Sequence, residues 1–241
     1  MATAGMTLAF QRLIVERRGA VGWILNDRPC RLNAYDDLMR AEFRRAYRQH
    51  DDDPEVRVVV HAATGRAFQV GVDVADLNAG DGAARYEREV AEFDLGLTSW
   101  HLGVRKPVVV AVNGICAGGG LHWLADADVV LAASDAQFVD PHVSVGQVSA
   151  FEPICLARRA PFEVVMRLAL VGSAERMDAA RAHALGLVSE VVDPPDRLHD
   201  AAQDVAEHIA ANDLEVVLAR KLDLWRSQER PGRPSTTGGA T

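Results

Sequence analysis

The chain has 241 residues, of which 49% are hydrophobic, so it can bury a sizeable core, and one large domain is expected rather than two. Its 26 Lys and Arg against 34 Asp and Glu give a net charge of −8, which argues against nucleic acid or an anionic membrane as a partner. Three widely spaced cysteines fit neither a disulfide framework nor a metal pattern, and no segment has the roughly 20 consecutive apolar residues of a membrane span. We therefore expect a soluble, cytoplasmic protein.

The first quarter of the chain alternates strand and helix patterns. Strands are expected over residues 13–16 and 21–26, joined by a turn at Arg18-Gly19. Apolar residues at helical spacing then predict a helix over residues 35–49. A continuous apolar strand over residues 56–61 follows, of the kind that is covered on both faces of a sheet.

The same alternation continues beyond residue 80. Five apolar residues, spaced alternately four and three apart, predict an amphipathic helix over residues 83–101: Tyr86, Val90, Phe93, Leu97 and Trp100. Further strands are expected over residues 108–112, 128–132 and 188–192, in a remainder that is mostly helical between residues 151 and 210. This recurrence of strand-then-helix units indicates an α/β architecture with right-handed crossovers.

Three consecutive glycines, Gly118, Gly119 and Gly120, lie between the strand at 108–112 and a short apolar helix. Backbone N–H groups without flanking side chains can approach a ligand closely there, at the positive end of the helix dipole. The guest is either a phosphate or an oxyanion that develops during a reaction; a tight structural turn is the alternative reading. No Gly-Lys-Ser/Thr follows and the spacing is not G-x-G-x-x-G, so the common nucleotide loops are excluded.

A second glycine loop lies upstream, in the segment AFQVGVDVADL at residues 67–77. Gly71 allows the backbone to bend so that Val72 presents its N–H. Together, the N–H groups of Val72 and Gly119 could form a two-donor cradle for a carbonyl oxygen that becomes an enolate. One such donor contributes about 3–4 kcal/mol to a reaction barrier.

These residues resemble the crotonase (enoyl-CoA hydratase/isomerase) superfamily. The matching segments appear in family order over roughly residues 10–195: RPCRLNAYDDLM, FQVGVDVADL, KPVVVAVNGICAGGG, ADADVVLAASDAQF and ERMDAARAHALGLVSEVV. The resemblance implies an α/β spiral of ββα turns with two roughly perpendicular sheets wrapped by helices. We accordingly expect a spiral core over residues 1–195, a shortened helical region over 196–229, and a disordered tail over 230–241, which is rich in Pro, Gly, Ser and Thr.

The resemblance also implies an acyl-CoA thioester as substrate, with coenzyme A as part of the substrate and no separate cofactor. The thioester oxygen would lie between the N–H groups of Val72 and Gly119, the positions that match the family's oxyanion hole. The remaining substrate-binding residues expected from the two glycine loops are Phe68, Gln69, Val70, Gly71, Asp73, Gly118 and Gly120, with Asp73 orienting its loop. A homotrimer or dimer of trimers is expected, although the C-terminal helices that help to build trimers in the family look shortened here.

Two positions depart from the family pattern. Hydratases of the family use two glutamates, and the matching residues here are His122 and His142. Imidazole, with an ordinary pKa near 6.5, can still accept and donate protons, so both are candidate catalytic residues. A buried structural histidine is the alternative for each. A metal held by the two rings lacks a third ligand at suitable spacing, so no metal is expected. Glu152 and Asp140 are possible auxiliary acids.

Several functions remain open from these residues. The leading one is a lyase that hydrates a 2-enoyl-CoA, as in fatty acid metabolism. The second is hydrolysis of a C–C bond in a cyclic β-diketone or β-ketoacyl-CoA by a retro-Claisen route, because a histidine at the second position resembles family hydrolases of this kind. A double-bond isomerase is third. The loss of both glutamates also leaves a non-catalytic acyl-CoA-binding protein open.

Overall fold

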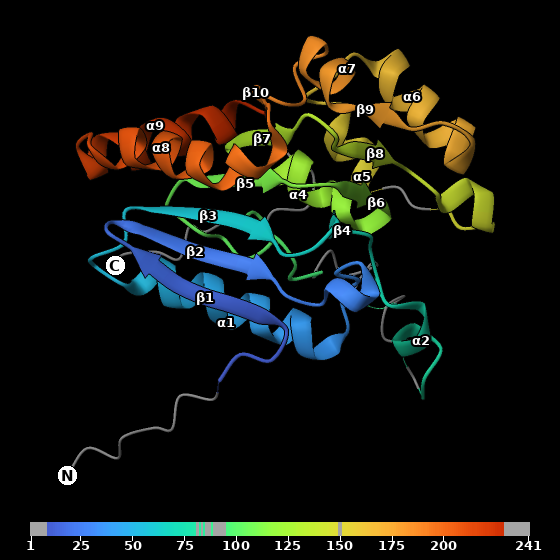
Figure 1. Cartoon of the computed structure of the whole chain (residues 1–241), viewed down its shortest axis with the longest axis horizontal. Helices are drawn as coiled ribbons and strands as arrows, with labels where there is room; N and C mark the ends of the chain where they lie inside the picture. Colours follow the sequence, from blue (N-terminus) through green and yellow to red (C-terminus); the bar gives the residue numbers. More distant parts are fainter. Residues whose placement is uncertain are drawn as a thin grey trace, which may run out of the picture.

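The computed structural model describes residues 9–80, 82, 84, 88, 95–148 and 151–228, which form two β-sheets wrapped by helices (Figure 1). The larger sheet has the order β1-β2-β3-β5-β7-β10. Its strands are β1 (Leu13–Arg18), β2 (Val21–Asn26), β3 (Val58–Ala63), β5 (Val108–Val112), β7 (Val129–Ala133) and β10 (Glu190–Val192). Only the β1–β2 hairpin is antiparallel; the other neighbours in this sheet are parallel.

A smaller sheet is built from short strands that follow those of the larger one. Its order is β4-β6-β8-β9, with β4 (Ala67–Gln69), β6 (Ile115–Ala117), β8 (Gln137–Val139) and β9 (Met177–Asp178). The chain passes from β3 to β4, from β5 to β6 and from β7 to β8, and each pair leads into a helix. This repeat confirms the expected ββα spiral with two sheets.

Helices cover both faces of the larger sheet. α8 (Leu198–Ala210) lies against β2, β3, β5 and β7, while α1 (Asp37–Asp52) lies under β1 and β2. The strands are buried on both faces, and successive side chains pack on opposite sides: Val58 and Val60 belong to the cluster that includes α8, whereas Val59 belongs to the cluster that includes α1. Each large side chain buried in this way stabilises the fold by about 1.5–3 kcal/mol.

The other helices of the described residues are α2 (Val74–Leu77), α4 (Leu121–Asp126), α5 (Phe151–Leu156), α6 (Phe162–Val171), α7 (Ala179–Ala184) and α9 (Leu214–Ser227). Single 3-10 turns are η1 (Pro29–Arg31), η2 (Gly118–Gly120), η3 (His142–Val145), η4 (Gly172–Ala174) and η5 (Pro195–Arg197). Among the described residues no helix is long and apolar enough to cross a membrane. The predicted tail at 230–241 lies outside the described residues.

Two predicted helix boundaries differ from the structure. The helix expected from residue 35 begins at Asp37, because the Asp36 side chain accepts a hydrogen bond from the Met39 amide and caps the first turn. The helix expected over 83–101 does not reach its predicted end: residues 95–97 have no regular secondary structure, residues 98–103 form a bend and turns, and Gly96 adopts φ +59°. Three of the residues that predicted this helix, Tyr86, Val90 and Phe93, lie outside the described part of the chain.

A buried histidine joins the larger sheet to the helices around it. His61 of β3 accepts a hydrogen bond at Nδ1 from Trp123 Nε1 of α4, at 3.2 Å, with the Tyr47 hydroxyl of α1 also 2.7 Å from Nδ1. Its Nε2 lies 2.9 Å from Asn26 Oδ1 of β2. Because Nδ1 accepts, the ring proton is on Nε2 and donates to Asn26. Burial lowers the pKa of His61 to about 3, so the ring is neutral in the folded protein.

We expect His61 to make the fold sensitive to acid. Between pH 6.5 and about 3 the unfolded chain binds a proton at His61 that the folded chain does not. Unfolding free energy should therefore fall as the pH falls, by about 1.4 kcal/mol per pH unit from this residue. Urea unfolding between pH 4 and pH 6.5 measures it: His61→Gln should show a correspondingly shallower pH dependence, whereas the exposed control His208→Gln should match the wild type. Equal slopes for His61→Gln and wild type would contradict this account.

Candidate active site

The first glycine loop, around Gly71, is hydrogen-bonded through its backbone to the segment before α1. Tyr35 N–H donates to the Gly71 carbonyl at 2.9 Å, and Asp73 N–H donates to the Tyr35 carbonyl at 2.8 Å. These two bonds flank Val72, whose own N–H has no acceptor among the described residues. The Val72 amide is therefore directed away from the Tyr35 segment and is available to a ligand.

The second glycine loop packs directly against the first. Gly71 has φ +93°, and a Cβ added to it would lie 3.1 Å from the Gly119 amide nitrogen. A Cβ added to Gly119 would lie 3.2 Å from Gly71 Cα. Gly119 is the second residue of η2, so its N–H has no acceptor within that turn. The backbones of Gly71 and Gly119 are thus in contact. The two predicted donors, the N–H groups of Val72 and Gly119, therefore belong to peptide groups that lie close together in space.

The other residues of these two loops are buried or closely packed. Phe68 and Gln69 are fully buried, the Phe68 carbonyl accepts from Asn26 Nδ2 at 3.0 Å, and the Gln69 side chain accepts from the Gly71 amide. Gly120 fits against the Gln69 carbonyl with no room for a Cβ, whereas Gly118 adopts φ +52° beside the His142 ring. Gly120 is therefore a close-packing position, and contact of Phe68, Gln69 and Val70 with a ligand stays a prediction.

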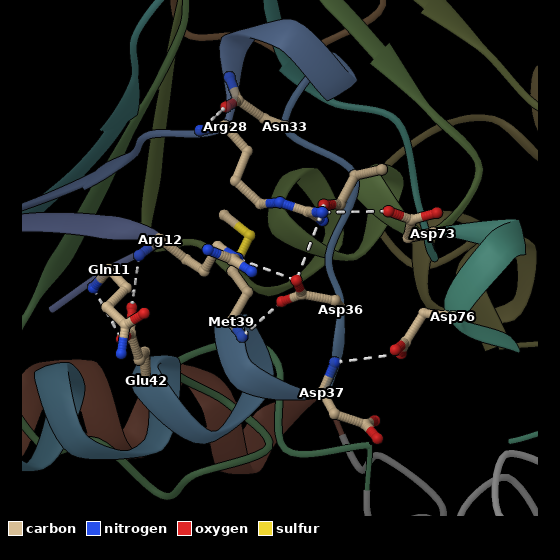
Figure 2. A network of polar contacts seen from close by, with 11 residues as sticks. Gln11, Arg12, Arg28, Asn33, Asp36, Asp37, Met39, Glu42, Asp73 and Asp76 are labelled. Atoms are coloured by element: carbon tan, nitrogen blue, oxygen red, sulfur yellow. Dashed lines mark hydrogen bonds and ion pairs between the residues drawn. The ribbon is translucent and has the colours of Figure 1, made fainter. Parts of the chain in front are cut away.

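An ion-pair network fixes the loop that carries Val72 (Figure 2). Arg28 Nη2 contacts Asp73 Oδ2 at 3.1 Å and Asp36 Oδ2 at 3.3 Å, and Arg12 Nε donates to the same Asp36 oxygen at 2.9 Å. Asp73 also accepts from the Ala75 amide and so caps α2. Asp73 therefore joins the start of α2 to the cap of α1, and a role in orienting its loop toward a ligand stays a prediction.

A buried carboxylate lies between the two predicted catalytic histidines. His122 of α4 has Nε2 3.3 Å from Glu152 Oε1, and His142 at the start of η3 has Nε2 4.0 Å from the same oxygen. His142 Nδ1 is 2.6 Å from Asp140 Oδ1. Glu152 is 1% exposed and Asp140 3%. The structure thus brings together all four residues that were expected to act as acids or bases, with Glu152 at the centre.

Both rings hold their protons more firmly than a free imidazole. Burial disfavours the charged form of His122, but the charge and hydrogen bond of Glu152, followed by the charge of Asp126, outweigh it, so the pKa of His122 is raised above 6.5. Burial also lowers the pKa of His142, but the hydrogen bond to Asp140 and the charges of Glu152 and Asp140 outweigh it. The pKa of His142 is therefore raised above 6.5 as well. The site can therefore offer a carboxylate acceptor and an imidazolium donor at the same pH.

A further cluster behind His122 was not predicted. Asp126, one turn after His122 on α4, accepts a hydrogen bond from Thr98 Oγ1 at 2.7 Å and lies 3.8 Å from His101 Nε2. His122 Nδ1 is buried on a side of the ring where no described residue gives it a hydrogen bond, a state that costs about 1–3 kcal/mol. The spacing of His122 and Asp126, four residues apart on one helix, is the signal in the sequence that could have indicated this cluster.

Comparisons with known proteins agree with this architecture. Residues 16–232 match the sequence model of the enoyl-CoA hydratase/isomerase family. A probable enoyl-CoA hydratase from Rhizobium meliloti is 34% identical over 223 residues, which cover 92% of this chain and 84% of that protein. A crystal structure of an enoyl-CoA hydratase/isomerase from Mycobacterium paratuberculosis has a TM-score of 0.81 and 36% identity, covering 92% of this chain and 84% of that one.

A relative with a different activity is also similar. The (7aS)-7a-methyl-1,5-dioxo-2,3,5,6,7,7a-hexahydro-1H-indene-carboxyl-CoA hydrolase from Rhodococcus jostii is 37% identical over 172 residues. The match covers 70% of this chain and 63% of that hydrolase. The chain is thus similar in sequence both to a probable hydratase and to a hydrolase. From the two-sheet spiral and these matches together, the chain belongs to the enoyl-CoA hydratase/isomerase family of the crotonase superfamily.

Proposed function

We propose that this chain is a lyase that adds water to the β-carbon of a 2-enoyl-CoA. The observation that supports it most directly is the buried Glu152 carboxylate between two imidazoles, next to a glycine turn whose backbone adjoins that of Gly71. Water addition next to a thioester needs three things: a proton acceptor, a proton donor and a site for enolate charge. Each has a candidate here.

The amides of Val72 and Gly119 would receive the thioester oxygen. When a nucleophile bonds to the β-carbon, electrons move through the α-carbon to this oxygen, which becomes an enolate. Two fixed N–H donors stabilise that charge more than the neutral thioester, and removing one such donor typically costs about 3–4 kcal/mol of transition-state stabilisation. CoA itself is part of the substrate, so the reaction uses no separate cofactor.

Glu152 and His142 would move the protons. Glu152 accepts a proton from water as its oxygen bonds to the β-carbon, and His142 Nε2 donates a proton to the α-carbon as the enolate collapses. The proton on Glu152 then returns to His142, whose Nε2 lies 4.0 Å away, and the net change is addition of H and OH across the double bond. Asp140 orients the His142 ring through Nδ1, and His122 positions Glu152 from the other side. The predicted pair of histidines thus acts through a shared carboxylate.

A second candidate, C–C bond hydrolysis, uses the same residues. Two observations favour it: the Asp140–His142 pair, which is an arrangement that can activate water, and the similarity to the Rhodococcus hydrolase of a bicyclic dione. Here water would attack a β-ketone carbon, the bond between the α- and β-carbons would break, and the thioester enolate would leave into the same amide pair before protonation. The two reactions differ in the substrate, not in the groups that the chain supplies.

We also propose that the chain is cytoplasmic and self-associates as a homotrimer or dimer of trimers. Support for self-association comes from exposed large apolar side chains on α6 and on the two elements that α6 contacts, η3 and α5. The exposed residues are Val143, Val145, Ile154, Phe162, Met166 and Leu170. Such a surface is typical of an interface between subunits.

Substrate assays distinguish the candidates. Crotonyl-CoA and longer 2-enoyl-CoAs should be hydrated, which the loss of the conjugated double bond measures in the ultraviolet. A cyclic β-diketone CoA ester that is opened to an acid, without turnover of any enoyl-CoA, would favour the hydrolase instead. Tight binding of CoA esters with neither reaction would leave a non-catalytic acyl-CoA-binding protein and reject both.

The amide pair can be blocked with one methyl group. In Gly71→Ala the new Cβ would lie 3.1 Å from the Gly119 nitrogen, so the substrate oxygen would lose access to that donor. We expect kcat to fall by about 10²- to 10³-fold, as when one oxyanion donor is removed.

Gly19→Ala is the matched control for that variant. It has a similar positive φ of +61° but nothing within 4 Å of the added Cβ, so it tests the backbone strain alone. Thermal unfolding of both variants shows whether each is folded. Full activity in folded Gly71→Ala would exclude the amide pair from the reaction.

Glu152 should matter more than its predicted auxiliary role suggests. Glu152→Gln keeps the size of the side chain but removes the proton acceptor. We expect kcat, measured with the substrate that the wild type turns over in the substrate assays, to fall by about 10²- to 10⁴-fold. The exposed Glu163→Gln on α6 is the control and should retain wild-type kcat. A Glu152→Gln rate within threefold of the wild type would assign the base to one of the histidines.

A further inference from the structure

We propose that His101, His122 and Asp126 bind a divalent transition-metal ion of the zinc class, on the side of His122 that faces away from Glu152. One donor atom from each of the three residues lies within 4.8 Å of the other two. His122 and Asp126 are one turn apart on α4, and His101 comes from the turn at residues 98–103. The site goes beyond the proposed function, because no step of water addition requires it.

The His122 ring supplies the strongest sign of a missing ligand. Its Nε2 faces Glu152 at 3.3 Å, whereas its Nδ1 is buried without a hydrogen-bond partner among the described residues. A buried imidazole nitrogen normally has a hydrogen-bond partner or a metal. Since the ring is 2% exposed, bulk water does not satisfy this nitrogen.

A single threonine, Thr98, contacts the other two proposed metal ligands, His101 and Asp126. Thr98 Oγ1 donates to Asp126 Oδ2 at 2.7 Å and lies 3.0 Å from His101 Nδ1. The Thr98 amide donates to His101 Nδ1 at 3.3 Å, so without an ion Nδ1 accepts and the ring proton is on Nε2, 3.8 Å from Asp126 Oδ2. An ion at Nε2 would move this proton to Nδ1, where the Thr98 hydroxyl, whose own proton goes to Asp126, would accept it.

Each histidine would therefore have the outer partner that metal-ligating histidines usually have. Glu152 accepts from His122 Nε2–H, which is the carboxylate–histidine–metal arrangement, and Thr98 fills the same role for His101. An ion on Nδ1 would fix the proton of His122 on Nε2, toward Glu152. The proposed site is thus connected to the candidate active site through one ring.

The donor set selects the class of ion. Two imidazoles and one carboxylate suit Zn²⁺, Co²⁺ or Ni²⁺, and not Mg²⁺ or Ca²⁺, which take oxygen ligands. Bonds of 2.0–2.2 Å in a tetrahedron place donors about 3.4 Å apart, so the 3.8 Å separation of His101 and Asp126 is close to that needed, and small side-chain rotations would close the rest.

An entry path also reaches the cluster. Asp126 lines a cavity of about 290 Å³ between the turn at 98–103 and α9, together with Trp100 and Trp225. Exposed residues of α9, Glu215 and Ala219, also line this cavity, so it is reached from the surface. The fourth coordination position can therefore be taken by water or by a group that enters from the α9 side.

Titration of the chelator-treated full chain with ZnCl₂ in a calorimeter, and with CoCl₂ followed by visible absorption, tests the site. We expect one ion per chain and the intense visible bands of four-coordinate Co²⁺. His101→Gln and Asp126→Asn should each weaken binding by at least about 100-fold, and Thr98→Val, which removes an outer partner, by about 10- to 100-fold. The exposed His208→Gln should bind as the wild type does.

Circular dichroism accompanies each titration, because Asp126→Asn changes a buried group. His101→Gln alters a residue on a turn, so it remains a test if Asp126→Asn fails to fold. Wild-type protein that binds no ion, or His101→Gln protein that binds within threefold of the wild type, would overturn the proposal. No CoA ester is present in these titrations, so their outcome is independent of whether the chain hydrates an enoyl-CoA.

Discussion

The contact between the backbones of Gly71 and Gly119 is the constraint on which the site depends. It forms where two crossovers from the larger sheet to the smaller one meet, and a Cβ on either residue would lie only 3.1 or 3.2 Å from a backbone atom of the other. Bonds on both sides of Val72 and the ion pairs of Arg28 fix one loop, while η2 and the buried helix α4 fix the other. The peptides that carry the two proposed donor amides are therefore held in place by the fold itself.

Carboxyl groups and imidazole rings alternate among the buried titratable residues of the candidate site. Asp140, His142, Glu152 and His122 follow one another at 2.6, 4.0 and 3.3 Å, so each carboxylate faces an imidazole. An isolated buried charge would be strongly destabilising, whereas alternation makes each group compensate for its neighbours. The raised pKa values of both histidines express this compensation. The fold thus holds four buried titratable side chains in contact, two carboxyl groups and two imidazoles.

The sequence predicts the parts of this fold that have a long or regular signal. The apolar runs of β2, β3, β5 and β7 and the periodicity of α1 are sufficient, because many residues contribute to each pattern. Strands of three residues, such as β4, β6 and β8, have too few residues to show a period. The candidate site was predicted residue by residue through the resemblance, but the central place of Glu152 was not, because the tertiary fold alone brings α5 between α4 and η3. The cluster of His101 and Asp126 was not predicted, because His101 lies on a turn where the sequence predicts a helix.

The ring of His122 joins two groups of titratable residues: its Nε2 lies 3.3 Å from Glu152, and donor atoms of His101 and Asp126 lie within 4.8 Å of one of its nitrogens. An imidazole transmits charge between its nitrogens, so the two sides form one thermodynamic unit. Whatever polarises Nδ1 changes the proton affinity of Nε2, and whatever displaces Glu152 changes the basicity of Nδ1. By linkage these influences are equal in both directions. An ion bound at the proposed site and the Glu152 carboxylate would consequently be coupled through one ring, without any movement of the backbone.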